Sequence, residues 1–245
     1  MRELLRVLRE HSSVRDYTPE PVTQESWHEL LAAAQQASTD ATGQLYCAVE
    51  VRDVNLRDRV GKWAGDQAHV HAAPRFVVVC LDVRRLRLLL EHRGERYGMK
   101  PHVALLFGIT DAALFGQNLS VAAEALGLGV CYIGGVQNHV GEIADALALP
   151  EGVIPLWGLT VGHPVKKLPP KPRLPRDIVV HVDAYRDPTP AQLDEAYDVM
   201  KAATRSGDWL NPLRKYFAES GVMAQREAAL HETLKARGLD PCTSP

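Results

Sequence analysis

The first residues that could do chemistry form a cluster near the start of the chain. The stretch HSSVRDYTPEPV begins at residue 11, so His11, Ser12, Ser13 and Arg15 bring an imidazole, two hydroxyls and a guanidinium within five residues. Such a set can cap a helix and stay solvated. It can also bind an anion, because guanidinium and hydroxyl groups are good donors to phosphate oxygens. Taken alone, the cluster leaves both interpretations open.

Two further stretches present the same choice between ligand binding and plain structure. Lys171 and Arg173 stand in KPRLP, a proline-rich segment whose stiffness would fix both cations, although basic coils of this kind are usually only surface. Gly134 and Gly135 follow a predicted strand, where the missing Cβ atoms would let a flat ligand approach the backbone closely. The alternative for the glycine pair is an ordinary turn.

Several common motifs do not fit this sequence. GLGVCYIGG has Tyr132 where the dinucleotide-binding fingerprint needs a glycine, and it lies between a helix and a strand instead of between a strand and a helix. The P-loop, the zinc-protease helix and the serine-hydrolase elbow are also missing. His69 and His71 are two residues apart, a poor spacing for a metal on a helix, so we predict no metal site.

The elements that must position these residues are mixed without strict alternation, which favours an α+β fold with a central helix over a doubly wound sheet. Apolar runs predict strands over 45–53, 74–83, 130–135 and 153–164, and a further short strand over 178–185. The longest helical pattern, 102–129, is apolar on most sides, which predicts a buried central helix closed by Gly127 and Gly129. Two helices are expected near the start of the chain, one before His11 and one after a cap formed by Thr23 with Ser26. A helix over 139–149 is expected to have Asn138 as its cap. Further helices are expected within 56–73, early in 84–101, and over 191–206 and 211–238.

Composition restricts the class of protein. The 245 residues carry 28 basic and 30 acidic side chains, so no basic excess argues for nucleic acid as a partner. No stretch approaches the roughly 20 apolar residues of a membrane span, and MRELLRVLRE lacks the apolar core of a signal peptide. We therefore expect a soluble, cytoplasmic protein that does not act on membranes. Its four cysteines form no C-x-x-C pair and are expected to be reduced.

Taken together and in order, these stretches resemble the flavin-dependent nitroreductase family, in particular its NADPH-preferring nitroreductase and flavin reductase branch. HSSVRDYTPEPV is similar to the opening signature of that family, and ASTDATGQLYCAVEV to its second segment. LGLGVCYIGGVQN and LPEGVIPLWGLTVGHP are similar to the glycine strand and the strand that follows it, and KPRLP to the phosphate-side loop. The resemblance covers roughly residues 5–185 well and the last sixty more loosely.

The resemblance implies a nitroreductase-like α+β fold: a mostly antiparallel central sheet flanked by helices, with a long buried central helix. It implies an FMN-binding core over 1–188 and a helical extension over 189–245 that packs on a homodimer, with FMN at the subunit interface. The phosphate and ribityl end of FMN would be held by His11, Ser13, Arg15, Lys171 and Arg173. Gln67 would face the polar edge of the flavin, and the ring would be lined by Tyr132, Ile133, Gly134 and Gly135, with the Gly134 N–H near flavin N5. The other subunit would supply Ser38, Thr39, Asp40, Thr42 and Gln44.

The second segment departs from the family pattern, with Ser38 where proline is common and Asp40 where a small hydroxyl is common. A carboxylate beside the flavin would disfavour its anionic reduced form. The sequence therefore leaves open whether Asp40 contacts FMN directly. Arg205 matches a basic position that the branch uses for the 2′-phosphate of NADPH, while use of NADH also stays open.

The implied reaction is a ping-pong transfer of hydride from NADPH or NADH, through flavin N5, to nitroaromatics, quinones or free flavin. It needs no obligatory side-chain acid or base. The alternatives are a non-catalytic FMN-binding protein, or azo-, chromate- or dehalogenation chemistry on the same fold.

Overall fold

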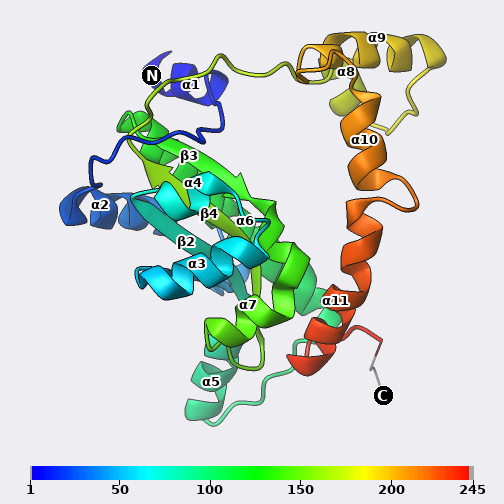
Figure 1. The fold of residues 1–245 in the computed structure, drawn as a ribbon. Coiled ribbons are helices and arrows are strands. Elements are labelled where there is room, and N and C mark those ends of the chain that lie inside the picture. Colours follow the sequence, from blue (N-terminus) through cyan, green and yellow to red (C-terminus); the bar gives the residue numbers. More distant parts are fainter. Residues whose placement is uncertain (1, 243–245) are drawn as a thin grey trace. The chain divides into compact units, whose positions relative to one another are not determined.

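The apolar run at residues 75–82 forms the centre of a four-stranded sheet in the computed structural model, which describes residues 2–242 (Figure 1). The strands are β1 (Tyr46–Glu50), β2 (Arg75–Asp82), β3 (Gly129–Ile133) and β4 (Val153–Gly162). Their order is β1-β2-β4-β3 and every neighbouring pair is antiparallel. From Phe76 onward every residue of β2 is buried, as expected of a β-branched run that is covered on both faces.

The pairing of β2 with β4 shifts register at one point. Val79 pairs with Trp157, but the next residue, Cys80, pairs with Pro155, so Leu156 is the extra residue of a bulge. Proline has no N–H to give to the ladder, and bulges are one of the few places where a strand inside a sheet accepts it.

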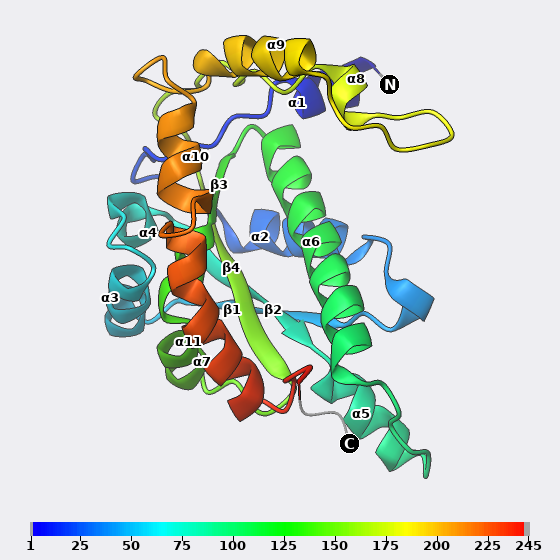
Figure 2. The same cartoon turned by 90° about the vertical axis from the view of Figure 1, so that its right-hand side faces the viewer.

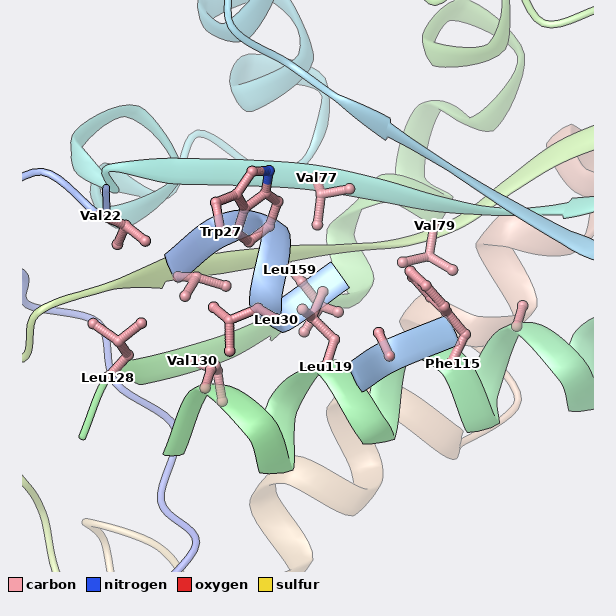
Figure 3. Close-up of a cluster of buried hydrophobic side chains, with 14 of the residues drawn as sticks. Val22, Trp27, Leu30, Val77, Val79, Phe115, Leu119, Leu128, Val130 and Leu159 are labelled. Carbon is pink, nitrogen blue, oxygen red and sulfur yellow. The ribbon is translucent and has the colours of Figure 1, made fainter. Parts of the chain in front are cut away.

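Helices cover both faces of the sheet. Val77 and Val79 point toward α2 (Gln24–Gln35) and α6 (Pro101–Ala125), where they meet Trp27, Leu119 and Phe115 in the cluster drawn in Figure 3. The alternate residues of β2, such as Phe76 and Val78, belong to a second cluster with side chains of α3 (Val54–Trp63), α4 (Ala68–Ala72) and α7 (Val140–Ala146). The predicted cap of α2 is confirmed, since the Thr23 hydroxyl accepts from the Ser26 N–H at 3.1 Å.

The long helix α6 runs beside the sheet (Figure 2) and is buried on one face only. Ala112, Phe115, Leu119 and Ala123 pack on the sheet, and Gly127 ends the helical region with φ of 76°. Other apolar side chains of α6 are exposed: Val103, Leu106, Ile109 and Leu114. The predicted central helix is therefore buried on the face that packs on the sheet and exposed on the other face. By length and composition alone α6 could cross a membrane, but 44% of its most apolar window is buried inside the protein, as in a core helix.

The chain divides into two units. The first comprises the residues up to Leu168 and those from Arg226 onward, and the second is Pro169–Gln225. The expected boundary at 188/189 differs from this division, and the assignment of an FMN-binding core and a dimer-packing extension stays a prediction. The remaining elements are α1 (Arg2–Arg9), η1 (Asp40–Thr42), α5 (Arg84–His92), η2 (Gly134–His139), α8 (Arg176–Val179), α9 (Pro190–Lys201), α10 (Leu210–Phe217) and α11 (Val222–Ala236).

Two local predictions are wrong. The strand expected over 178–185 is absent, and residues 176–179 form α8 with Pro175 as its N-cap, because a β-rich sequence forms a strand only where a sheet edge is free to pair with it. Asn138 does not cap α7, because it lies inside η2 and His139 holds the cap position without a side-chain bond. The amide oxygen of Asn138 instead accepts two bonds from Arg226, at 2.7 and 3.0 Å.

Candidate functional site

The segment with His11, Ser13 and Arg15 follows α1 and is bonded to the start of β3. The Val14 N–H donates to the Val130 carbonyl at 2.8 Å, and the side chain of Val14 is buried against Gly129. The Tyr17 hydroxyl donates to the Val14 carbonyl at 2.9 Å. With Val14 turned inward, Arg15 on its C-terminal side is exposed.

His11 is oriented by a carboxylate of the central helix. Its Nδ1 donates to Oε1 of Glu124 at 2.9 Å, and the Glu124 side chain is 9% exposed. A bond at Nδ1 fixes the plane of the imidazole ring and leaves Nε2 as its free position. The pair is 113 residues apart in sequence, so no local pattern predicts it.

The charge of Arg15 acts on two further side chains, Cys131 and His69. Burial lowers the pKa of His69, and the Arg15 charge lowers it further. Burial raises the pKa of Cys131, against the opposing effects of Arg15 and of a hydrogen bond with Ser13. In the sequence His69 stands out only as a possible metal ligand, whereas in the structure its buried ring lies within the electrostatic influence of Arg15. The signal in the sequence that could have linked His69 to the site is its position two residues after Gln67.

Gln67 and Gly135 meet at one residue, Ala64. The Gln67 side-chain amide donates to the Ala64 carbonyl at 3.0 Å. A Cβ atom on Gly135 would stand 2.0 Å from the same carbonyl oxygen, so the backbones are in direct contact there. A Cβ on Gly134 would meet nothing within 4 Å, and this residue is exposed. The two glycines therefore differ. Packing against Ala64 requires a glycine at position 135, whereas a side chain at position 134 would extend into open space.

The other predicted residues of β3 face different ways. The side chain of Tyr132 is 37% exposed, and its ring is 6.2 Å from that of Trp157. Ile133 is fully buried in the second core cluster. Any contact of Ile133 with a ligand would therefore be through its backbone.

The predicted second segment forms a short loop around η1. Ser38, Asp40, Thr42 and Gln44 are exposed and Thr39 is half-buried. Ala41, Thr42 and Gln44 have positive φ angles of 43°, 59° and 51°. The N–H groups of Asp40 and Leu45 donate to the two oxygens of Asp111, each at 2.9 Å.

The remaining predicted cations belong to the second unit. Lys171, Arg173 and Arg205 are all exposed there, and the Arg173 guanidinium donates to the carbonyls of Lys171 and Pro172 at 3.2 and 3.3 Å. The convergence of Lys171 and Arg173 with the cluster around Arg15 stays a prediction.

The residues of the first unit suit an anionic, flat cofactor. Arg15 enters no ion pair within residues 2–242, and its polar neighbours Ser13 and His11 carry no negative charge. The open backbone at Gly134 and the amide of Gln67 come to the same end of β3. A cation without an ion-pair partner, beside hydroxyl and imidazole groups at the start of β3, fits the phosphate of a flavin nucleotide, and the accessible backbone after the other end of β3 fits its ring. Residues 2–242 hold no group of three or more His, Cys, Asp or Glu side chains placed for a metal ion.

Comparisons with known proteins identify the family and the fold. A family model described as the nitroreductase family matches residues 8–163. A Cr(VI) reductase of Pseudomonas sp. (strain G-1) is 35% identical over 96% of this chain and 98% of its own. An FMN reductase (NADPH) of Bacillus subtilis is 36% identical over 76% of this chain and 75% of its own. The solved nitroreductase A of Vibrio parahaemolyticus superposes with a TM-score of 0.87 at 29% identity, covering 97% and 98% of the two chains.

The family model covers well over half of the chain, and the fold is shared with the solved structure across nearly the whole length of both proteins. This confirms the fold class and the resemblance seen in the sequence, and it shows that the chain belongs to the nitroreductase family.

Proposed function

We propose that the chain is an FMN-dependent oxidoreductase that takes hydride from NADPH or NADH and transfers two electrons to nitroaromatics, quinones or free flavin. The observation that carries the proposal is Arg15, an exposed guanidinium without an ion-pair partner in residues 2–242, beside Ser13 and a His11 oriented by Glu124. Membership of the nitroreductase family supports it, and so do the names of the relatives.

Each residue has a defined task in this proposal. Arg15 would pair with the phosphate, with the Ser13 hydroxyl as a further donor. His11 would donate from Nε2 in its imidazolium form, since its Nδ1–H is bonded to Glu124, and Lys171 and Arg173 would complete the clamp. Gln67 would meet the polar edge of the flavin, and Tyr132 and the backbone of Ile133 and Gly135 would border the ring. The exposed Gly134 backbone would offer its N–H to N5.

Bound FMN would supply the redox chemistry itself, accepting hydride at N5 and giving up two electrons. The protein would contribute position and electrostatics: a donor at Gly134 steadies negative charge, and one open face serves the coenzyme and then the acceptor. A shared face of this kind makes the reaction ping-pong. Arg205 would pair with the 2′-phosphate of NADPH.

We also infer that two copies of the chain form a homodimer. The exposed face of α6 supports this, since Leu106 is 63% exposed, Val103 44% and Ile109 42%. A run of apolar side chains on one helix face is typical of a surface that a partner covers. In the dimer the partner would supply Ser38, Thr39, Thr42 and Gln44, and the adjacent Asp40, to the flavin site. A cytoplasmic location fits this proposal and stays a prediction.

The test is an anaerobic absorbance spectrum of the purified protein, before and after one equivalent of NADPH, repeated with NADH. We expect a flavin band that bleaches and returns when a nitroaromatic or quinone is added. A yellow protein that neither coenzyme bleaches would favour the non-catalytic FMN-binding alternative. A colourless protein that takes up no added FMN would overturn the proposal.

One observation favours a second acceptor. The relative that spans 96% of this chain is named a Cr(VI) reductase. Chromate should therefore be tried in the reoxidation step beside the nitroaromatic and the quinone. Reoxidation by chromate at a rate similar to that with the organic acceptors would make oxyanion reduction a candidate activity of this chain.

A further inference from the structure

The strongest unexplained polar feature outside the proposed contacts is a buried carboxylate on the central helix. Asp111 is 0% exposed, in the middle of α6, and it faces the loop that contains η1. Its Oδ1 accepts from the Asp40 N–H and its Oδ2 from the Leu45 N–H, both at 2.9 Å. One side chain therefore holds both ends of a six-residue segment, 40–45.

The same loop is held where it enters β1 by a second side chain, which binds backbone carbonyl groups. The Arg85 guanidinium donates to the Gln44 carbonyl and, at 2.9 Å, to the Tyr46 carbonyl. The Arg85 backbone N–H in turn donates to Asp82 at 3.1 Å. Asp111 thus binds backbone N–H groups of this region, and Arg85 binds its backbone carbonyl groups.

The loop needs such anchors because its backbone is unfavourable. Ala41, Thr42 and Gln44 all have positive φ, the left-handed region that residues with a Cβ rarely adopt. Gly43, which would tolerate it best, has φ of −71°. Three residues in this region persist only where the surroundings over-determine the conformation.

We propose that Asp111 is a positioning residue for FMN binding: through Asp40 and Leu45 it fixes the loop whose exposed side chains Thr42 and Gln44 meet the flavin. The inference rests on the proposed function, because that function makes the loop a flavin contact. Asp111 itself is fully buried and touches the loop backbone, so it acts on the cofactor only through the loop.

The test is Asp111→Asn in the purified holoenzyme. Asparagine has nearly the same shape, but it presents an NH₂ group where a second acceptor is needed, so one of the two loop N–H groups loses its partner. We expect hydrogen exchange of the Asp40 and Leu45 amides to accelerate by about tenfold or more, and the Kd for FMN to rise by about tenfold. The visible spectrum of the bound flavin should also shift.

Two more variants keep the result interpretable. Arg85→Ala removes the donors to the Gln44 and Tyr46 carbonyls, and because Arg85 is exposed the variant should fold. It should raise exchange and the Kd for FMN in the same direction even if Asp111→Asn does not fold. Leu119→Ala is the stability control, because Leu119 is a fully buried residue of the same helix that packs on the sheet. It should lower the melting temperature without changing exchange in segment 40–45 or the Kd for FMN.

The outcomes separate the inference from the function on which it rests. Unchanged exchange of the two amides in Asp111→Asn and in Arg85→Ala would overturn the anchoring role. Faster exchange with wild-type FMN affinity and spectrum would overturn the link to the cofactor. A wild-type protein that binds no FMN would instead refute the proposed function.

Discussion

Arg15 is the residue on which the proposed cofactor site depends most. Its exposed guanidinium enters no ion pair within residues 2–242. We expect Arg15→Ala to lose a charge-assisted contact worth about 1.5–3 kcal/mol, so that the Kd for FMN rises by roughly 10- to 100-fold. Flavin fluorescence released on dilution measures this.

The matched control for this variant is Arg9→Ala, which makes the same charge change at an exposed position of α1. It should leave FMN retention unchanged. Full flavin occupancy of Arg15→Ala under dilution, or equal losses in both variants, would remove Arg15 from the phosphate site.

His69 should make the stability of the protein depend on pH. Burial and the neighbouring Arg15 lower its pKa below the ordinary value of 6.5. At pH values below 6.5, the unfolded chain therefore binds a proton at residue 69 that the folded chain does not bind. The free energy of unfolding then falls as the pH falls through that range. In His69→Gln this part of the pH dependence should vanish.

Urea unfolding at about pH 7.5 and about pH 5 gives the comparison for His69. The quantity to compare is the loss of stability between the two pH values, because the substitution of a buried side chain also shifts stability at both. An equal loss in the wild type and in His69→Gln would show that His69 does not titrate as its surroundings indicate.

At the scale of elements, the turn from β3 into η2 packs against the end of α3. A Cβ on Gly135 would stand 2.0 Å from the Ala64 carbonyl oxygen, so the two elements would have to separate. We expect Gly135→Ala to destabilise the fold by about 1–3 kcal/mol, as overpacking does. Gly134→Ala, one residue earlier in open space, is the matched control and should be close to neutral in urea unfolding.

The elements themselves were largely predictable from the sequence, and their polar contacts were not. The strand at 75–82 and the helix at 101–125 follow from continuous apolar runs, whose period and length are local properties. The bond of His11 with Glu124 joins residues 113 apart, and that of Asp40 with Asp111 residues 71 apart. Such partners depend on the tertiary fold, which no local pattern encodes.

The wrong predictions have a related cause. Residues 178–185 have the composition of a strand, but a strand also needs an edge to pair with, and residues 176–179 form the helix α8 instead. Asn138 has the chemistry of a cap, but η2 extends to His139 and moves the start of α7 by one residue. In both places tertiary context overrode the local propensity.

At the scale of the whole molecule, the one-sided burial of α6 leads to the last prediction. Leu106 is the most exposed of the apolar side chains on this helix, at 63%. In a symmetric dimer each substitution acts twice, and each buried leucine contributes about 1.5–3 kcal/mol. Leu106→Glu should therefore raise the dissociation constant of the dimer by about 100-fold or more, as measured by sedimentation equilibrium.

Val54→Glu is the control for this prediction, because Val54 is an even more exposed apolar residue, at 70%, on α3 instead of α6. If α6 forms the interface, only Leu106→Glu makes monomers, and those monomers also lose FMN, because the partner would supply Thr42 and Gln44. A monomeric wild type, or a Leu106→Glu protein as dimeric as Val54→Glu, would mean that this face serves another purpose. Monomers that keep their FMN would show that each flavin site is complete within one chain.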